Sequence, residues 1–203
     1  MISADKCDIR RRVHAERQRL TPEFLTAAGA AISRRLAALP VYQTARSVLV
    51  YLAVGNEVPT EPLIARAHGD GKQLYLPRQT PAAGFVPWSP RQPLHAGRGG
   101  VLEPAEGDVV VPQLPAIACI PLVAWSADGT RLGRGGGFYD RVLAQLPRAL
   151  ARIGLAFEFQ HVSRLPRAAW DQPLDFVITE QRVVWCADSA PAARLQKGGV
   201  DVR

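Results

Sequence analysis

The sequence of 203 residues has no apolar stretch of the roughly 20 residues that a membrane-spanning helix requires. Its N-terminal segment is basic, but no apolar segment of the secretory type follows, so we expect no signal peptide. Charged residues make up 21% of the chain, too few for a disordered polyelectrolyte, and hydrophobic residues make up 47%. We therefore expect a soluble, cytoplasmic protein with one domain over residues 1–188 and a flexible tail over residues 189–203.

Cysteine is scarce and offers no framework for disulfides or a metal. Cys7, Cys119 and Cys186 are widely spaced, with no C-x-x-C pair and no histidine cluster nearby. An odd, scattered set of this kind argues against both a disulfide scaffold and a zinc site. We expect three reduced thiols, most of them buried.

Acidic residues are outnumbered by basic ones, which gives a formal net charge of +7. Such a charge suits nucleic acid, a membrane surface or a small polyanionic ligand. The positive residues are dispersed except for residues 10–12, which are three arginines, and none of the recognised nucleic-acid module signatures occurs. Small anions therefore remain candidate ligands.

Two familiar nucleotide-binding motifs are also missing. A dinucleotide fingerprint needs a glycine three residues after Gly135, where this chain has Phe138. A P-loop needs serine or threonine after Gly-Lys, but Gly71-Lys72 is followed by Gln73. Any phosphate site in this chain must therefore be of another kind.

A glycine-rich stretch at residues 129–141, with the sequence GTRLGRGGGFYDR, is the most informative feature of the chain. Its glycines leave backbone N–H groups open to approach, and we expect a helix to begin directly after them. Such a loop forms an anion cradle suited to phosphate, to which Arg131 and Arg134 add positive charge. A tight turn without a ligand is the competing interpretation.

Two further features allow two interpretations each. Asp140 is placed to meet a Mg²⁺ ion that bridges phosphate oxygens, or to form a surface pair with Arg141. Lys6, Arg10 and His14 are spaced i, i+4 and i+8, which puts them on one face of a helix. That face is either part of a site or a solvated basic stripe.

Hydrophobic periodicity predicts an alternation of helices and strands typical of an α/β fold. Helices are expected over residues 5–20, 21–39, 60–68 and 139–146. Strands are expected over residues 47–53, 71–77, 84–88, 108–111, 116–120, 153–157, 175–179 and 183–185. The first two strands and the helix between them form a βαβ unit, so they should pair in parallel. The loop at residues 54–59 then lies at the carboxyl end of a strand, where open α/β sheets bind ligands.

The segment TRLGRGGGFYDR at residues 130–141 closely resembles the signature of the 5-formyltetrahydrofolate cyclo-ligase family, also called 5,10-methenyltetrahydrofolate synthetases. Other family segments follow in family order, at near-family spacing, over roughly residues 6 to 180. The matching segments are Lys6 with Arg10, Leu39-Pro40, Tyr51, residues 55–60, Gly71-Lys72, residues 76–78, residues 99–104, residues 153–157, Gln160, Leu165-Pro166, Asp171, Leu174-Asp175 and Thr179-Glu180.

The resemblance implies a single-domain, three-layer Rossmann-like fold of the NagB/RpiA/CoA transferase-like type, with a mainly parallel central sheet. It implies ATP-dependent and Mg²⁺-dependent closure of 5-formyltetrahydrofolate to 5,10-methenyltetrahydrofolate, with release of ADP and phosphate. The γ-phosphoryl group would activate the formyl oxygen, and the folate N10 would then attack the formyl carbon. The expected partners are these two small molecules, with no membrane and no nucleic acid, and we expect a monomer.

The resemblance also assigns roles to individual residues. Arg131, Arg134 and Tyr139 would be catalytic, and Asp140 and Asp171 would hold Mg²⁺. The ATP-binding residues would be Lys6, Arg10, Arg131, Gly133, Arg134, Gly135, Gly136, Gly137, Phe138 and Tyr139. The folate-binding residues would be Tyr51, Glu57, Gly135, Gly136, Gly137, Phe138 and Tyr139.

The chain departs from the family pattern at two places. The family commonly has two tyrosines where this chain has Phe138-Tyr139, so one hydroxyl is lost and the ring is kept. The strand before the glycine-rich loop commonly ends in A-F-D, whereas residues 124–126 read A-W-S; Asp128 is a candidate substitute for the lost acid. A non-catalytic or altered-substrate relative that binds nucleotide, folate or RNA is therefore the alternative interpretation.

Overall fold

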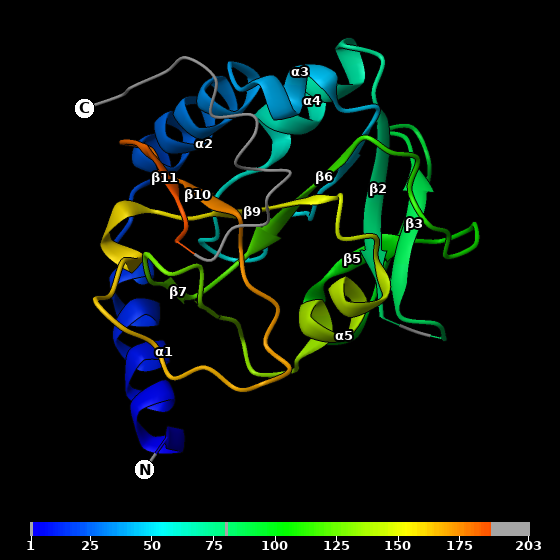
Figure 1. Ribbon diagram of the computed structural model, residues 1–203. Coiled ribbons are helices and arrows are strands. Elements are labelled where there is room, and N and C mark those ends of the chain that lie inside the picture. Colours follow the sequence, from blue (N-terminus) through cyan, green and yellow to red (C-terminus); the bar gives the residue numbers. More distant parts are fainter. Residues whose placement is uncertain (1, 80, 188–203) are drawn as a thin grey trace.

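The computed structural model describes residues 2–79 and 81–187, so the expected tail at residues 189–203 lies outside the described residues. Figure 1 shows three layers, with a central sheet between helices that cover its two faces. This arrangement confirms the predicted α/β class and the mainly parallel central sheet. No helix in the described ranges is long and apolar enough to cross a membrane.

The central sheet has seven strands in the described residues, in the order β11-β10-β9-β6-β1-β2-β3. The inner strands from β10 to β2 all pair in parallel, and the two edge strands are antiparallel to their neighbours. The strands are β1 (Ser47–Leu49), β2 (Gln73–Arg78), β3 (Gly84–Trp88), β6 (Ala116–Pro121), β9 (Ala151–Leu155), β10 (Phe176–Ile178) and β11 (Val183–Trp185). The predicted parallel pairing of the first βαβ unit is confirmed.

Three helices cover one face of the sheet, namely α2 (Pro22–Ala37), α3 (Pro40–Thr44) and α4 (Glu61–Gly69). Thr21 caps the start of α2, since the backbone N–H of Phe24 donates to the Thr21 hydroxyl at 3.2 Å. Apolar side chains of α2 and α4, among them Ile32, Leu36 and Leu63, pack on Val48 and its neighbours in one core cluster. Burial of this apolar surface holds the layer together.

The opposite face is covered by α5 (Phe138–Gln145), whose Val142 and Leu143 pack on the other side of the sheet with Leu49. The helix α1 (Ile2–Gln18) lies apart from both layers, where Val13 packs against Leu132 and neighbours. Leu132 belongs to the hairpin of β7 (Ala124–Trp125) and β8 (Arg131–Leu132). This hairpin leads into the glycine-rich loop, so α1 is brought beside that loop.

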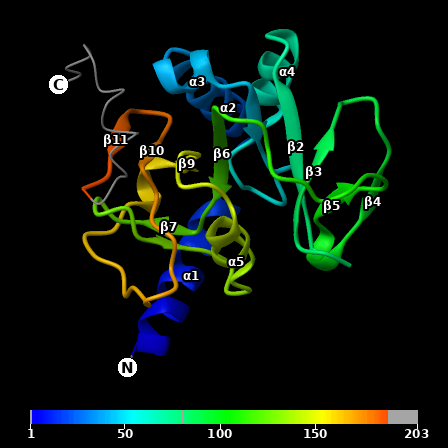
Figure 2. The same cartoon turned by 45° about the vertical axis from the view of Figure 1, so that its right-hand side comes forward.

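A second small hairpin of β4 (Leu94–Ala96) and β5 (Leu102–Pro104) lies beside β3 at the edge of the molecule, as Figure 2 shows. Short 3₁₀ turns occur at Arg98–Gly100 and Glu158–Gln160. None of the predicted strands covers this hairpin, whose region is rich in proline and glycine. The hairpin forms nevertheless, with Gly99 and Gly100 at positive φ in its turn.

The predicted strand at residues 108–111 is wrong. Within the described part of the chain, its apolar run makes one isolated backbone bond, in which Val110 N–H donates to the Phe85 carbonyl at 3.1 Å. Val111 is 63% exposed, so the run does not enter the core. The strand predicted at residues 47–53 is shorter than expected, because β1 ends at Leu49 and the chain then turns into the loop that forms part of the site.

Candidate functional site

A cavity of about 640 Å³ opens at the carboxyl ends of the parallel strands. Its floor includes residues that follow β1, β6 and β2, namely Leu52, Leu122 and Gln79. The strand order reverses direction between β1 and β6, which is where open α/β sheets bind ligands. The cavity is lined by all of the predicted site residues: Lys6, Arg10, Tyr51, Glu57, Arg131, Gly133, Arg134, Gly135, Gly136, Gly137, Phe138, Tyr139, Asp140 and Asp171.

The glycine-rich loop runs from β8 to the start of α5, as the sequence predicted. Gly135 has φ +106° and Gly137 has φ +62°, and Gly137 is the residue that precedes the first turn of the helix. These left-handed conformations favour glycine strongly. The loop is exposed on the cavity side, so its backbone and the helix N-terminus are open to an anion.

The basic face of α1 points to this loop rather than only to solvent. Arg10 Nε donates to the Gly133 carbonyl at 2.9 Å, and Lys6 Nζ lies 3.9 Å from Asp171 Oδ2. His14, the third member of the stripe, is exposed and does not line the cavity. Each interpretation of this face therefore holds for part of it: Lys6 and Arg10 line the cavity, and His14 is solvated.

Asp140 pairs with Arg131 across the cavity rather than with Arg141. Arg131 Nη2 donates to Asp140 Oδ1 at 2.5 Å, and the Arg131 side chain is only 5% exposed. Arg141 Nη1 instead donates to the Gly136 carbonyl at 2.8 Å, which braces the loop. Burial lowers the pKa of Arg131, and the negative charge of Asp140 opposes that shift.

The two cavity aspartates are each held from one side. Asp140 Oδ1 also accepts from the Gln172 N–H at 3.1 Å, and Asp171 Oδ2 accepts from the Ala168 N–H at 2.8 Å. Their other oxygens accept no hydrogen bond from the described residues. In residues 2–79 and 81–187 no group of three or more His, Cys, Asp or Glu side chains could hold a metal by itself. Two carboxylates in one cavity fit Mg²⁺, which commonly takes one or two carboxylates and completes its shell with phosphates and water.

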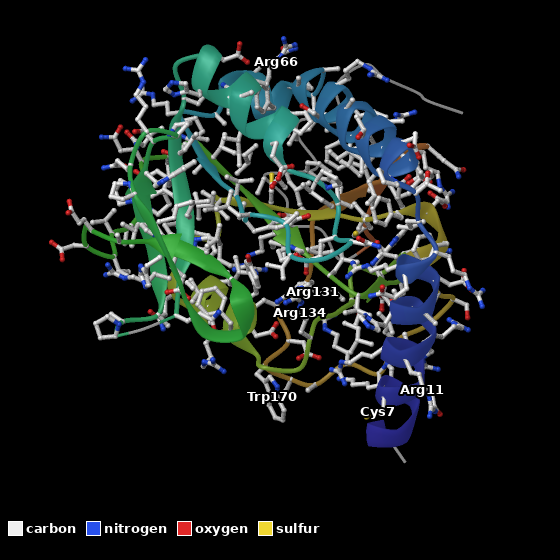
Figure 3. The ribbon with its side chains drawn as sticks, turned by 180° about the vertical axis from the view of Figure 1, so that it is seen from behind. Cys7, Arg11, Arg66, Arg131, Arg134 and Trp170 are labelled. Atoms are coloured by element: carbon white, nitrogen blue, oxygen red, sulfur yellow. The ribbon has the colours of Figure 1, made fainter. Side chains whose placement is uncertain are left out.

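Glu57 is buried, with 7% of its surface exposed, and both of its oxygens are engaged. Oε2 accepts from the Val54 N–H at 3.1 Å, and Oε1 lies 3.1 Å from Arg134 Nη2. Arg134 also donates to the Val54 carbonyl at 3.2 Å, and half of its side chain is exposed. The pair joins the loop after β1 to the glycine-rich loop, although the two loops are far apart in the sequence. Arg134 is labelled beside Arg131 in Figure 3.

Tyr51 and Tyr139 form an aromatic wall of the cavity. Burial raises the pKa of each phenol, and the charge of Glu57 raises it further, so both stay protonated in the neutral range. The Tyr51 hydroxyl donates to the Val58 carbonyl at 3.1 Å. The Tyr139 ring lies 6.4 Å from that of Phe85 and meets Phe138 edge-on at 5.2 Å.

The sequence model of the 5-formyltetrahydrofolate cyclo-ligase family matches residues 2–180. The chain belongs to this enzyme family. The 5-formyltetrahydrofolate cyclo-ligase of Escherichia coli K12 is 35% identical over 178 residues, covering 84% of this chain and 98% of the relative. The mouse cyclo-ligase is 26% identical over 163 residues, covering 73% of this chain and 80% of the relative.

Solved structures agree with this membership. The NMR structure of the 5,10-methenyltetrahydrofolate synthetase of Aquifex aeolicus is 32% identical, with a TM-score of 0.77. The similarity covers 91% of this chain and 94% of that one. The synthetase structure from Mycoplasma pneumoniae, at 24% identity and a TM-score of 0.69, shares the fold.

The departure of this cyclo-ligase family member at residues 124–126 lies beyond the cavity. Trp125 is fully buried and packs against His161, with ring centroids 4.5 Å apart. The Ser126 hydroxyl donates to Asp128 Oδ1 at 2.6 Å, and Thr130 N–H donates to the same oxygen at 3.0 Å. Neither Ser126 nor Asp128 lines the cavity. Because Asp128 accepts these two hydrogen bonds, it holds the β7–β8 turn.

Several cavity residues were not predicted from the sequence. They include Leu52, Gln79, Val101, Arg141 and Trp170. Arg141 and Val101 lie within matching segments without an assigned role, and the other three each follow or precede a matching residue directly.

Arg17, on α1, is a further residue that the sequence did not indicate. It is 8% exposed, and its Nη2 donates to the carbonyl of Leu122 at 2.5 Å. Burial lowers the pKa of Arg17, and the charge of Glu57 raises it. Arg17 thus adds a buried positive charge behind the Glu57 carboxylate.

Proposed function

We propose that the protein converts 5-formyltetrahydrofolate to 5,10-methenyltetrahydrofolate and consumes ATP, releasing ADP and phosphate. One observation carries this proposal: a single cavity joins an exposed glycine-rich loop, cations from α1 and β8, and a buried glutamate on the loop after β1. The first two features suit a polyphosphate, and the third suits a group that becomes cationic. The names of the family and of its relatives support the same reaction.

The chemistry needs activation because a formyl oxygen is a poor leaving group. Transfer of the γ-phosphoryl group from ATP to that oxygen forms an O–P bond and releases ADP. The folate N10 then attacks the formyl carbon, the carbon–oxygen bond breaks, and phosphate leaves with the former formyl oxygen. N10 loses its proton, and the product carries a positive charge shared between N5 and N10.

The residues of the glycine-rich loop and α1 would bind and orient the phosphates. Arg10 reaches the loop from α1, Lys6 lines the same cavity beside Asp171, and Arg131 is fixed by Asp140 at the edge of the loop. Phosphoryl transfer depends mostly on positioning and charge neutralisation, which this set of donors supplies. Phe138 and Tyr139 would form the wall between nucleotide and folate.

Mg²⁺ would be held by Asp140 and Asp171 together with the phosphates of ATP. The ion supplies neutralisation of the charge on the transferred group. Arg131 keeps the Asp140 carboxylate in place, and the Ala168 N–H does the same for Asp171.

Glu57 and Arg134 would exchange partners during the reaction. Arg134 is half exposed at the cavity surface and pairs with Glu57 in this structure. A bound triphosphate offers Arg134 a stronger partner, because arginine binds phosphate with paired hydrogen bonds. The Glu57 carboxylate is then free to stabilise the cationic product, with the buried charge of Arg17 behind it.

The oligomeric state, the domain bounds and the cellular location are also part of the proposal. We propose that the protein acts as a monomer. We propose residues 1–188 as the catalytic domain and a cytoplasmic location, where folates and ATP are both available. Sedimentation of the purified protein at micromolar concentration tests the monomer.

An absorbance assay for the methenyl product tests the proposed function. The purified protein is mixed with 5-formyltetrahydrofolate, ATP and Mg²⁺, and each component is left out in turn. We expect product only in the complete mixture, with one ADP formed for each product. Product formation without ATP would contradict the proposal, as would ATP binding with no turnover of this folate.

A further inference from the structure

Trp170 is an apolar side chain that the proposed chemistry leaves unused. It is 73% exposed, the most exposed of the six large hydrophobic side chains that are exposed in the described residues. Of those six, it alone lines the cavity. An indole left in water at the mouth of a site loses the free energy that burial would give, unless a ligand covers it.

Hydrogen bonds hold the backbone on both sides of Trp170. The Ala168 N–H donates to Asp171 Oδ2 at 2.8 Å, and the Asp171 N–H donates back to the Ala168 carbonyl at 3.1 Å. Gln172 Nε2 donates to the Trp170 carbonyl at 3.2 Å, and Arg131 donates to the Gln172 carbonyl. The turn that carries the indole is therefore held by hydrogen bonds to its neighbours.

The neighbours of this turn belong to the phosphate half of the cavity. Asp171 faces Lys6, and Gln172 binds Asp140 and Arg131. The described residues show no hydrogen bond or ion pair between residues 168–172 and the Glu57 loop. In Figure 3 the Trp170 side chain lies at the lower edge of the molecule, below Arg131 and Arg134. A ligand whose phosphates lie on Lys6 and the glycine-rich loop would extend its remaining part toward this edge.

We propose that Trp170 stacks on the purine base of the nucleotide and so selects a nucleoside triphosphate over a bare polyphosphate. The inference rests on the proposed function, because it takes the phosphate half of the cavity to bind ATP. Every purine presents a π-face, and stacking of a base on an aromatic side chain contributes substantially to affinity. Removal of such a ring weakens nucleotide binding about tenfold or more.

The test is titration calorimetry with two ligands, Mg-ATP and Mg-tripolyphosphate, on the purified full chain. The proteins are the wild type, Trp170→Ala, Trp170→Phe and the control Val111→Ala, which removes an exposed apolar side chain outside the cavity. We expect Trp170→Ala to weaken ATP binding about tenfold or more and to leave tripolyphosphate binding unchanged. Trp170→Phe should restore most of the ATP affinity, and Val111→Ala should match the wild type.

Steady-state rates give a second readout. Trp170→Ala should raise the KM for ATP by a similar factor while kcat and the KM for the folate stay near the wild-type values. Equal ATP binding by Trp170→Ala and the wild type would overturn the inference, and so would an equal loss of tripolyphosphate binding. A selective rise in the KM for the folate would also overturn it, because the ring would then belong to the folate half. A wild type that binds no ATP would overturn the proposed function itself.

Discussion

Two carboxylates in the cavity, Asp140 and Glu57, are each paired with an arginine, and the two pairs differ in burial. Arg131 beside Asp140 is 5% exposed, whereas Arg134 beside Glu57 is 50% exposed. A buried pair is costly to break because the remaining charge stays out of water. The Arg131–Asp140 pair therefore suits a fixed framework, and the Arg134–Glu57 pair suits a contact that a ligand exchanges.

Replacing Asp140 by Asn should lower turnover about 100-fold or more while the fold is retained. The amide still accepts a hydrogen bond from Arg131, but it loses the charge that opposes Arg131 and that would hold Mg²⁺. Turnover and circular dichroism on the same preparation measure both effects. Asp8→Asn, at an exposed surface pair with Arg11, is the matched control. An unchanged rate in Asp140→Asn would show that Asp140 has no part in the reaction.

Replacing Glu57 by Gln should lower kcat about 10- to 100-fold and leave ATP affinity equal or higher. The amide cannot balance a cationic product, and it competes less strongly than the carboxylate for Arg134. Rate measurements and calorimetry with Mg-ATP separate the two effects, with the exposed Glu61→Gln as control. A large loss of ATP affinity in Glu57→Gln would contradict the partner exchange.

Asp128 gives a pH-dependent prediction. Although burial raises its pKa, hydrogen bonds from Ser126 and Thr130 outweigh this effect and leave the pKa below the ordinary value of 3.8. A folded-state pKa below the unfolded value contributes stability above that value, and this stability is lost as the pH falls through the folded pKa. Asp128→Asn should therefore flatten the acid side of the stability profile in denaturant titrations. Turnover at neutral pH should stay near wild type, whereas a collapse of turnover would make Asp128 a substitute for the family acid.

At the scale of elements, the glycine-rich loop is built for backbone access. Gly135 and Gly137 hold positive φ, while Gly136 does not, and an added Cβ on Gly136 meets nothing within 4 Å. Alanine substitutions at these neighbouring glycines therefore separate the effect of backbone strain from the effect of an added methyl group. The loop places a helix N-terminus, an arginine brace and two backbone turns in one short segment.

Replacing Gly137 by Ala should destabilise the protein by about 1–2 kcal/mol, because a side chain in the left-handed region is strained. Gly136→Ala adds the same methyl group without that strain, so its stability should stay within about 0.5 kcal/mol of the wild type. Urea unfolding of both variants measures the difference. Equal stabilities for the two variants would show that the loop does not hold the described conformation at Gly137.

Much of the fold could be predicted because its elements carry their own signals. Thr21 and Pro22 marked the start of α2, and the glycines before Phe138 marked the start of α5. The prediction of a strand at residues 108–111 was wrong because an apolar run indicates only the local preference of the chain. Whether a strand forms also depends on pairing partners that the tertiary fold supplies. The β4–β5 hairpin was missed for the converse reason, since turn residues masked two short strands.

The site residues, too, include some that the sequence could predict and some that it could not. Residues within the motif, such as Arg131 and Asp140, could be predicted because their neighbours in sequence are also neighbours in the cavity. Arg17, Gln172 and Trp170 were not predicted, because no local pattern marks them. Gln172 and Trp170 flank the predicted Asp171, and Arg17 reaches the Leu122 carbonyl only through packing. Their contributions are a buried charge, a brace for Asp140 and a candidate base platform.

At the scale of the whole molecule, the net charge of +7 is matched by a cavity that gathers Lys6, Arg10, Arg131 and Arg134. Both proposed substrates are anions, so a positive field speeds their capture. Salt screens such fields, with a Debye length that falls from about 30 Å at 0.01 M to about 8 Å at 0.15 M.

Raising the salt concentration over this range should therefore lower kcat/KM for both ATP and the folate. Removal of charge at Arg12, an exposed residue of α1 outside the cavity, should change this dependence less than Arg10→Gln does. Steady-state rates at several salt concentrations give the two slopes. Identical slopes for Arg10→Gln and Arg12→Gln would place the effect in the overall charge rather than in the cavity.

The central claim is that the cavity brings the γ-phosphate of ATP to the formyl oxygen of the folate. Its most direct test uses 5-formyltetrahydrofolate labelled with ¹⁸O in the formyl group, with mass spectrometry of the phosphate released in a complete reaction. We predict that each phosphate carries one ¹⁸O atom, because the carbon–oxygen bond breaks after the oxygen has received the phosphoryl group. Unlabelled phosphate, with the ¹⁸O found in water, would contradict phosphoryl activation of the formyl oxygen.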